Sequence, residues 1–122
     1  MSRGAALVID SESRANGVVV LALGGELVVT SRELLREAAE CEIANGARSL
    51  VVAVGRLTHI DTSGLALLVR LAGGCAESGG RLAVAGLKPD FLEMRQHLFL
   101  DEALLFADDV EGAVAAVSAA TR

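Results

Sequence analysis

Residues 50–72 read LVVAVGRLTHIDTSGLALLVRLA, in which an apolar run, a polar turn and a second apolar stretch follow one another directly. The run at residues 50–54 has no polar side chain, which is typical of a short strand buried on both faces of a sheet. Residues 55–61 read as a loop. From residue 63 to residue 76, apolar side chains recur at the i, i+3, i+4, i+7 spacing of a helix. This succession of strand, loop and helix predicts an α/β fold.

The chain before this unit contains two short runs rich in β-branched residues and one helical segment. The segment between the two runs ends in Asn16-Gly17, a strong hairpin signal, so we expect the runs to pair antiparallel. Thr30 and Glu33 have the spacing of a capping box, which predicts a helix with Thr30 as its N-cap. The predicted elements are strands at residues 5–10 and 18–23 and a helix at residues 31–44.

The chain after the unit continues the alternation of strands and helices. Pro89 suits the first turn of a helix, and Asp108-Asp109 suit the start of another. The predicted elements are strands at residues 82–85 and 103–107, a helix at residues 89–98, and a final helix with an apolar face of Val110, Ala113, Val114 and Val117. The full order is ββαβαβαβα, which predicts a single α/β domain over residues 1–122, with a mixed sheet of about five strands and four helices.

Composition and charge narrow the classes of function. The 122 residues are 52% hydrophobic, yet only three are aromatic, so the core is expected to be aliphatic. A formal net charge of −5 argues against a protein that follows a nucleic-acid backbone. No apolar run approaches the ~20 residues needed to cross a bilayer, and the N-terminus lacks the apolar core of a signal peptide. We therefore expect a cytoplasmic protein that binds neither nucleic acid nor membrane.

No residue pattern indicates catalysis, a metal site or a cofactor. Cys41 and Cys75 lie far apart without a partner at metal-ligand spacing, which predicts reduced thiols that serve only packing. His59 and His97 lie in no catalytic motif, and no phosphate-binding glycine loop occurs. His59 is interpreted as a loop residue or a partner contact, and His97 as a surface helix residue. The chain is therefore not expected to be an enzyme.

The segment Asp61-Thr62-Ser63 permits two interpretations from chemistry alone. Its carboxylate and hydroxyls could simply cap the first turn of the following helix, a role worth ~1 kcal/mol. Alternatively, hydroxyls at the start of a helix could be modified and act in a switch, because a helix N-terminus accepts negative charge.

The segment Ile60-Asp61-Thr62-Ser63-Gly64-Leu65 resembles the phosphorylation motif of the STAS family, named for sulphate transporters and anti-sigma factor antagonists. Gly25-Glu26-Leu27 resembles a second motif of that family, although Val28 stands where the family usually carries Asp. The resemblance implies that Thr62 is the phosphorylated residue, with Ser63 as a second candidate. The residues then expected to bind the partner are Glu26, His59, Asp61, Thr62, Ser63 and Gly64.

The same resemblance implies an anti-sigma factor antagonist. In its unphosphorylated form such a protein binds an anti-sigma factor that is itself a Ser/Thr kinase, and so frees a sigma factor; phosphorylation of Thr62 breaks the complex and a phosphatase restores it. One alternative is an accessory module of a transport system or a ligand-binding STAS domain, for which we expect a pocket near residues 25–30 and 86–89. A component of a stress-sensing scaffold is a third interpretation.

Overall fold

A five-stranded mixed sheet forms the centre of the computed structural model, which describes residues 7–88 and 104–120. The strands are β1 (Val8–Ser13), β2 (Val18–Leu27), β3 (Ser49–Ile60), β4 (Leu82–Ala85) and β5 (Leu105–Ala107). The helices are α1 (Arg32–Ala44), α2 (Thr62–Glu77) and α4 (Val110–Ala120). The spatial order is β1-β2-β3-β4-β5, with β1 antiparallel to β2 and every other neighbouring pair parallel. The predicted α/β fold with about five strands is confirmed.

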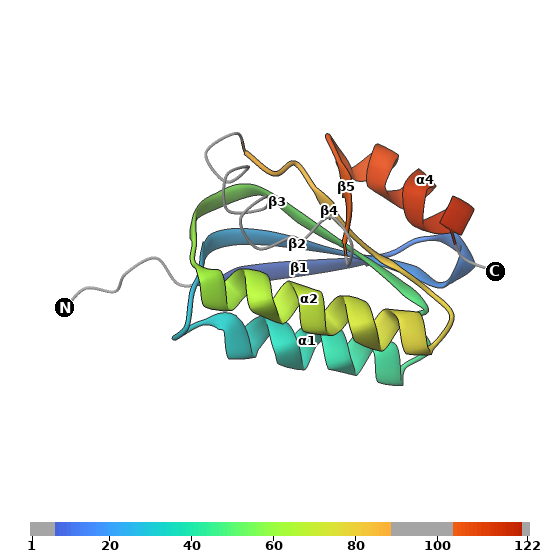
Figure 1. The fold of residues 1–122 in the computed structure, drawn as a ribbon, viewed down its shortest axis with the longest axis horizontal. Coiled ribbons are helices and arrows are strands. Elements are labelled where there is room, and N and C mark those ends of the chain that lie inside the picture. The colour runs from blue at the N-terminus through green and yellow to red at the C-terminus, as the bar shows by residue number, and fades with distance from the viewer. Residues whose placement is uncertain (1–6, 89–103, 121–122) are drawn as a thin grey trace.

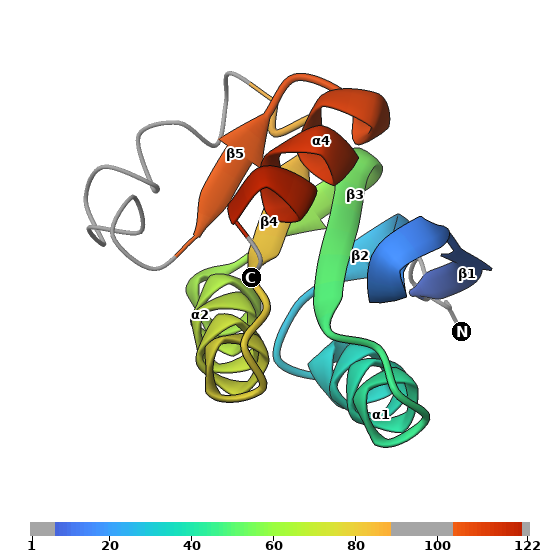
Figure 2. The same ribbon diagram turned by 90° about the vertical axis from the view of Figure 1, so that its right-hand side faces the viewer.

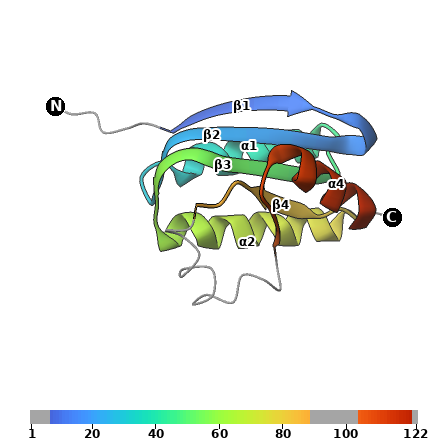
Figure 3. The same cartoon turned by 90° about the horizontal axis from the view of Figure 1, so that it is seen from above.

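The helices cover the two faces of the sheet unequally. Helices α1 and α2 lie side by side on one face, and α4 lies on the other (Figures 1 and 2). The view from above shows α1 and α2 running along the sheet beneath β2, β3 and β4 (Figure 3). The crossovers from β2 to β3 and from β3 to β4 step in the same direction along the sheet, so with a common handedness they place α1 and α2 on one face.

Each face of the sheet has its own aliphatic core. The larger core packs Leu21, Leu50 and Val52 of the sheet against Leu35 of α1 and Leu68 of α2. The smaller core lies beneath α4 and consists of Val18, Val20, Val51, Ala83, Ala85, Ala113 and Val117. Strand β3 contributes to both cores, as its unbroken apolar run predicts.

The hairpin of β1 and β2 uses the turn that its sequence predicts. Asn16 (φ 66) and Gly17 (φ 75) both adopt left-handed backbone conformations, which Asn and Gly tolerate best. The first strand nevertheless runs to Ser13, three residues beyond the predicted end. Next to the turn, Arg14 donates from both terminal nitrogens to Glu111 of α4, at 3.2 and 3.0 Å. This ion pair links the hairpin to the last helix.

The loop predicted at residues 55–61 is wrong for most of its length. Strand β3 continues to Ile60 and stays paired with β2, which itself extends to Leu27. Leu57 and Ile60 are both buried in the larger core, so burial favours the strand despite the polar residues between them. The register shifts by one residue at two places, and this irregularity hides the strand from a simple period-two pattern.

The capping box predicted at Thr30 is also wrong. The N-cap of α1 is Ser31, whose side chain does not cap the helix. Its hydroxyl instead donates to the carbonyl of Glu26 at 2.7 Å and accepts from the amide of Val28 at 3.0 Å. Glu33 pairs with Arg36 one turn later and does not reach back to the N-cap. Contacts with the end of β2 therefore override the local capping pattern.

The remaining expectations concern the helix predicted after β4, membrane-spanning helices and the two cysteines. The helix predicted at residues 89–98, with His97, lies outside the described residues. Within residues 7–88 and 104–120, no helix is long and apolar enough to cross a bilayer. Cys75 is buried, as expected for a packing thiol, and burial raises its pKa to about 11. Cys41 is exposed on α1, so the packing role predicted for it is wrong.

The buried position of β3 generates a stability prediction. Val52 is 0% exposed, so Val52→Asp places an unpaired carboxylate in the core and should prevent cooperative folding. The matched control is Val8→Asp on β1, because Val8 is 57% exposed and the new charge stays in water. Thermal melting followed by circular dichroism checks both variants. A Val52→Asp protein that melts cooperatively near the wild-type temperature contradicts this placement of β3.

Candidate functional site

The candidate site lies where β3 ends and α2 begins, beside the end of β2 (Figure 1). Asp61 is the N-cap of α2, with an extended backbone conformation that turns the chain from strand to helix. Its amide donates to the carbonyl of Leu27 at 3.2 Å, which extends the pairing of β2 and β3 to the first residue of the turn. The residues on either side of this junction are therefore held by the sheet.

The carboxylate of Asp61 accepts three hydrogen bonds. One oxygen, Oδ1, accepts from the amide of Gly64 at 2.9 Å and from the hydroxyl of Ser63 at 2.7 Å. The other, Oδ2, accepts from the amide of Val29 at 3.1 Å. The first two bonds satisfy the start of α2, and the third reaches the turn between β2 and α1. Asp61 thus joins two separate segments of the chain.

These hydrogen bonds also set the acidity of Asp61. Partial burial acts to raise its pKa, but the bonds from Ser63, Gly64 and Val29 stabilise the ionised form and outweigh that effect. The pKa of Asp61 is consequently lowered from its ordinary value. The carboxylate is charged at neutral pH, next to the two hydroxyls.

The two hydroxyls that follow Asp61 have different surroundings. Ser63 is half-buried and donates to Asp61. Thr62, the first residue of α2, is exposed on the surface. Among the contacts of the described residues, none is a hydrogen bond from the Thr62 hydroxyl. Within the described part of the chain, the side chain of Thr62 is therefore exposed and not hydrogen-bonded, whereas the Ser63 hydroxyl is engaged by Asp61.

Gly64 allows α2 to approach the end of β2 closely. A Cβ atom on this residue would lie 2.7 Å from the carbonyl oxygen of Leu27 and 2.9 Å from the Cγ of the same residue. Such contacts are far inside normal packing distance. The glycine of the motif is therefore required by the packing of the helix against the sheet.

The structure brings all six predicted partner-binding residues to one edge of the sheet. Glu26 and His59 are partners in the register of β2 and β3, one position before the Leu27 and Ile60 pair. His59 is exposed and Glu26 is half-buried. His59 belongs to β3 and not to the predicted loop, and the strand holds it beside the Asp61 junction.

Three residues that the sequence analysis missed also belong to this edge. Val29 donates its amide to Asp61 while its side chain is 60% exposed. Ser31 bonds to the end of β2, as described above. Lys88 donates its ammonium group to the carbonyl of Leu57 at 2.7 Å, across 31 positions of the chain. The contacts of Val29 and Lys88 span 32 and 31 positions of the chain, so only the folded sheet brings their partners near. The contact of Ser31 spans five positions, but it depends on where β2 ends.

The site has an exposed Thr62 at the start of α2, and the hydrogen bonds of Asp61 hold that helix start in place. Across the described part of the chain, no group of three or more His, Cys, Asp or Glu side chains could hold a metal ion. A phosphate on Thr62 would lie at the N-terminus of α2, where the helix dipole favours an anion. The geometry suits a residue that another protein modifies and reads.

Comparisons with known proteins agree with this fold. A family model described as "Mlab, STAS domain" matches residues 11–106. A search of curated proteins finds no significant match. An anti-sigma factor antagonist from Mycobacterium paratuberculosis is similar in structure, with a TM-score of 0.77, 19% identity, and coverage of 97% of this chain and 99% of that chain.

Two further solved structures share the fold. The Bacillus cell fate determinant SpoIIAA in its phosphorylated form has a TM-score of 0.70 at 24% identity, with coverage of 90% of this chain and 99% of that chain. The murine anion transporter Slc26a9 has a TM-score of 0.68 at 11% identity, with coverage of 94% of this chain and 22% of that chain. At these identities the structural matches establish the fold alone.

The close approach at Gly64 predicts opposite effects for two glycines of α2. Gly64→Ala should destabilise the domain by ~1–3 kcal/mol, because its methyl group collides with Leu27. Gly73→Ala is the matched control: its Cβ meets nothing within 4 Å, so higher helix propensity should stabilise the protein by ~0.5–1 kcal/mol. Urea unfolding measures both. Equal effects of the two substitutions contradict the packing role of Gly64.

The lowered pKa of Asp61 predicts a dependence of stability on pH. Because the folded pKa lies below the unfolded value of about 3.9, the stability that the ionised carboxylate contributes is present above that value and is lost as pH falls through the folded pKa. Asp61→Asn should therefore be less stable than wild type at neutral pH, and the difference should shrink towards pH ~3. Urea unfolding across this range measures it. Asp10→Asn, an exposed change on β1, controls for net charge, and a constant difference contradicts the ionised cap.

Proposed function

The chain belongs to the STAS domain family, and on that premise we propose that it is an anti-sigma factor antagonist switched by phosphorylation of Thr62. Residues 1–122 form one STAS domain. Unphosphorylated, it binds an anti-sigma factor that is a Ser/Thr kinase, and the sigma factor is released in the cytoplasm. The kinase supplies ATP and the catalytic groups, so this chain is a substrate that needs no cofactor, and a phosphatase reverses the modification.

The exposure of Thr62 is the observation that supports this proposal most directly. Its hydroxyl lies at the surface on the first residue of α2, while the neighbouring Ser63 hydroxyl is bonded to Asp61. The difference favours Thr62 over Ser63 as the acceptor. Asp61 keeps the helix start in place, so the acceptor is presented on a rigid support.

Phosphorylation in this proposal changes the interface and leaves the fold intact. A phosphate adds about −1.5 to −2 charge at neutral pH. At the N-terminus of α2 the helix dipole stabilises that charge. A bound partner, however, has to desolvate it next to the ionised Asp61, and each 1.4 kcal/mol of that cost weakens binding about tenfold.

The partner surface in this proposal is the edge of the sheet around Thr62. It contains Glu26 and His59 from neighbouring strands and the motif residues Asp61 and Ser63, while Gly64 is buried beneath them. The exposed side chain of Val29 lies on the adjoining turn, which provides apolar area beside the acceptor. With Val28 in place of the family's usual Asp, this edge carries one fewer carboxylate.

An accessory role in a transport system is the second candidate function. The observation in its favour is the shared fold with transporter proteins, including a sulfate transporter family protein from Wolinella succinogenes at a TM-score of 0.73 and 18% identity. In that role the domain would contact a transporter subunit and need no phosphorylated hydroxyl. The experiment below separates the two roles.

Substitutions at the two hydroxyls test the switch. Wild type, Thr62→Ala, Ser63→Ala and Thr62→Glu are incubated with the cognate anti-sigma kinase and ATP, and phosphate incorporation and anti-sigma affinity are measured. Thr62→Ala should bind without being labelled, and Ser63→Ala should still be labelled. Thr62→Glu should melt within a few degrees of wild type but bind at least about tenfold more weakly.

The control is Thr30→Ala, which removes an exposed hydroxyl from the neighbouring turn and should alter neither labelling nor affinity. Labelling that persists in Thr62→Ala and disappears in Ser63→Ala moves the acceptor to Ser63. If none of these substitutions changes labelling or binding, the switch is refuted in favour of the transport role.

A further inference from the structure

The face of the sheet that α4 covers changes character halfway along the strands. Near the start of β2 and β3, Val18, Val20 and Val51 fill the space beneath α4. Towards the strand ends, this face instead carries Ala22, Ala53 and Ala85 as direct neighbours in the register of three strands. Helix α4 begins at Val110, near this end of the strands. Beyond the valines, the surface of the sheet therefore consists of the methyl groups of the three alanines, which we call the alanine row.

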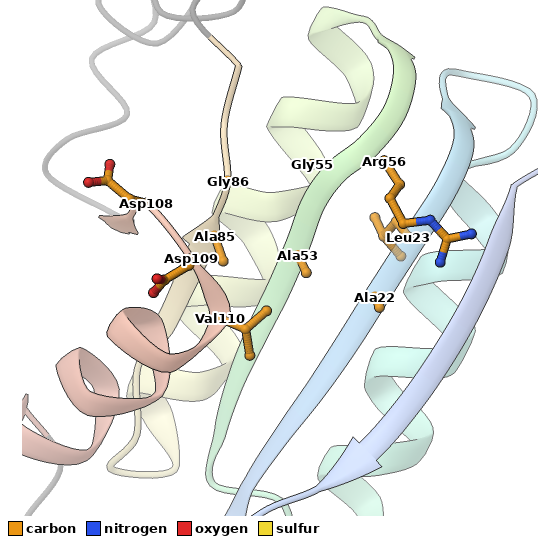
Figure 4. A pocket seen from close by; sticks show the side chains of 10 residues that line it. All are labelled: Ala22, Leu23, Ala53, Gly55, Arg56, Ala85, Gly86, Asp108, Asp109 and Val110. Carbon is orange, nitrogen blue, oxygen red and sulfur yellow. The ribbon is translucent and has the colours of Figure 1, made fainter.

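A cavity of about 350 Å³ lies over this alanine row (Figure 4). Its other lining residues include Gly55, Gly86 and Val110. Gly86 has a φ of +78°, and a Cβ on it would lie 3.4 Å from the backbone of Gly55, so neither residue provides a side chain to fill the space. The volume is in the range of small-molecule sites, ~300–1,000 Å³, and most of the lining is apolar.

A β-bulge places Arg56 on the side of the sheet where this cavity lies, and its side chain extends from β3 across β2 (Figure 4). The register passes from Ala22 opposite Ala53 to Gly24 opposite Arg56, so β3 has one residue more than β2 between these pairs. Val54 and Leu57 consequently both enter the larger core on the opposite face. Arg56 is left on the α4 side, where it lines the cavity. Bulges often re-aim a side chain next to a binding site.

The positive and negative charges around the cavity lie on opposite sides of it. Arg56 is exposed and has no ion pair with any residue in the described ranges. Asp108 and Asp109 lie on the opposite side, next to α4 (Figure 4). The Oδ1 of Asp109 accepts from the amide of Gly112 at 2.8 Å and so caps α4. An anionic group is therefore favoured beside Arg56 and disfavoured beside the two aspartates.

We propose that this cavity binds a small amphipathic carboxylate, with its apolar body over Ala22, Ala53 and Ala85 and its carboxylate on Arg56. An arginine can donate two parallel hydrogen bonds to one carboxylate. The methyl groups of the alanine row can pack against an aliphatic chain without leaving a polar group unpaired. Thr62 is not among the residues that line this cavity, so the proposal does not depend on the phosphorylation switch.

The cavity also differs from the pocket expected near residues 25–30 and 86–89 for a ligand-binding domain. It includes Gly86 but none of residues 25–30. Its recognition comes from one cation above an apolar floor, and not from many converging polar groups. The anionic end of the occupant follows from Arg56, because Asp108 and Asp109 lie on the opposite side of the cavity (Figure 4).

Octanoate serves as the probe, with 1-octanol and octyltrimethylammonium as neutral and cationic comparisons. Each is titrated into the full chain and followed by the methyl resonances of the alanines in NMR spectra. Octanoate should shift the Ala22, Ala53 and Ala85 methyls saturably and bind at least about tenfold more tightly than 1-octanol. Octyltrimethylammonium, whose cation is repelled by Arg56, should bind more weakly than octanoate.

Substitutions of Arg56 and of the alanine row assign the contacts. Arg56→Gln should reduce octanoate affinity to that of 1-octanol, while Arg70→Gln, which removes an exposed arginine of α2, should leave it unchanged. Ala53→Leu should abolish binding by filling the floor. Ala22→Leu provides the same test if Ala53→Leu fails to melt cooperatively. Absent or unsaturable shifts, equal affinity for all three probes, or undiminished octanoate binding by Arg56→Gln overturns the proposal.

Discussion

The carboxylate of Asp61 is the constraint on which the functional edge of this domain depends. It accepts hydrogen bonds from the start of α2 and from the turn between β2 and α1. One side chain therefore joins the segment after β2 to the segment after β3. Gly64 makes the same junction compact, because its lack of a Cβ lets α2 touch the backbone of Leu27. Both residues therefore stabilise the start of α2 at this position.

A rigid junction of this kind suits a residue that is modified and read by other proteins. Since Asp61 is bonded internally, the helix start does not rely on the Thr62 hydroxyl, and a change at Thr62 leaves the supporting bonds in place. The energetic consequence of an added charge therefore falls on whatever binds the edge. In the proposed switch, the capping role and the regulatory role of the motif are complementary, because the cap provides the platform for the acceptor.

Strand β3 serves both of the surfaces discussed above through its two irregularities. The first bulge sends Arg56 to the α4 side, above the alanine row, while Val54 and Leu57 stay in the larger core. The second, between the Gly25 and Glu26 pairings, lets Ile60 return to the same core and delivers Asp61 to the junction. An extra residue at each place changes which face a side chain meets without breaking the pairing of the strands.

The sequence by itself determined the elements whose signals are local. The apolar run at residues 50–54, the Asn16-Gly17 turn and the helical repeat after Ser63 each predicted a feature that the structure contains, and the motif at residues 60–65 located the candidate site. Tertiary structure alone decided that residues 55–60 extend β3, that Ser31 replaces Thr30 as the N-cap of α1, and that Ser63 bonds to Asp61 while Thr62 is exposed. The physical reason is that burial and competing hydrogen bonds override the local patterns. Leu57 and Ile60 are buried only when the sheet has assembled. The Ser31 hydroxyl bonds to the carbonyl of Glu26 at the end of β2, and the Ser63 hydroxyl bonds to Asp61.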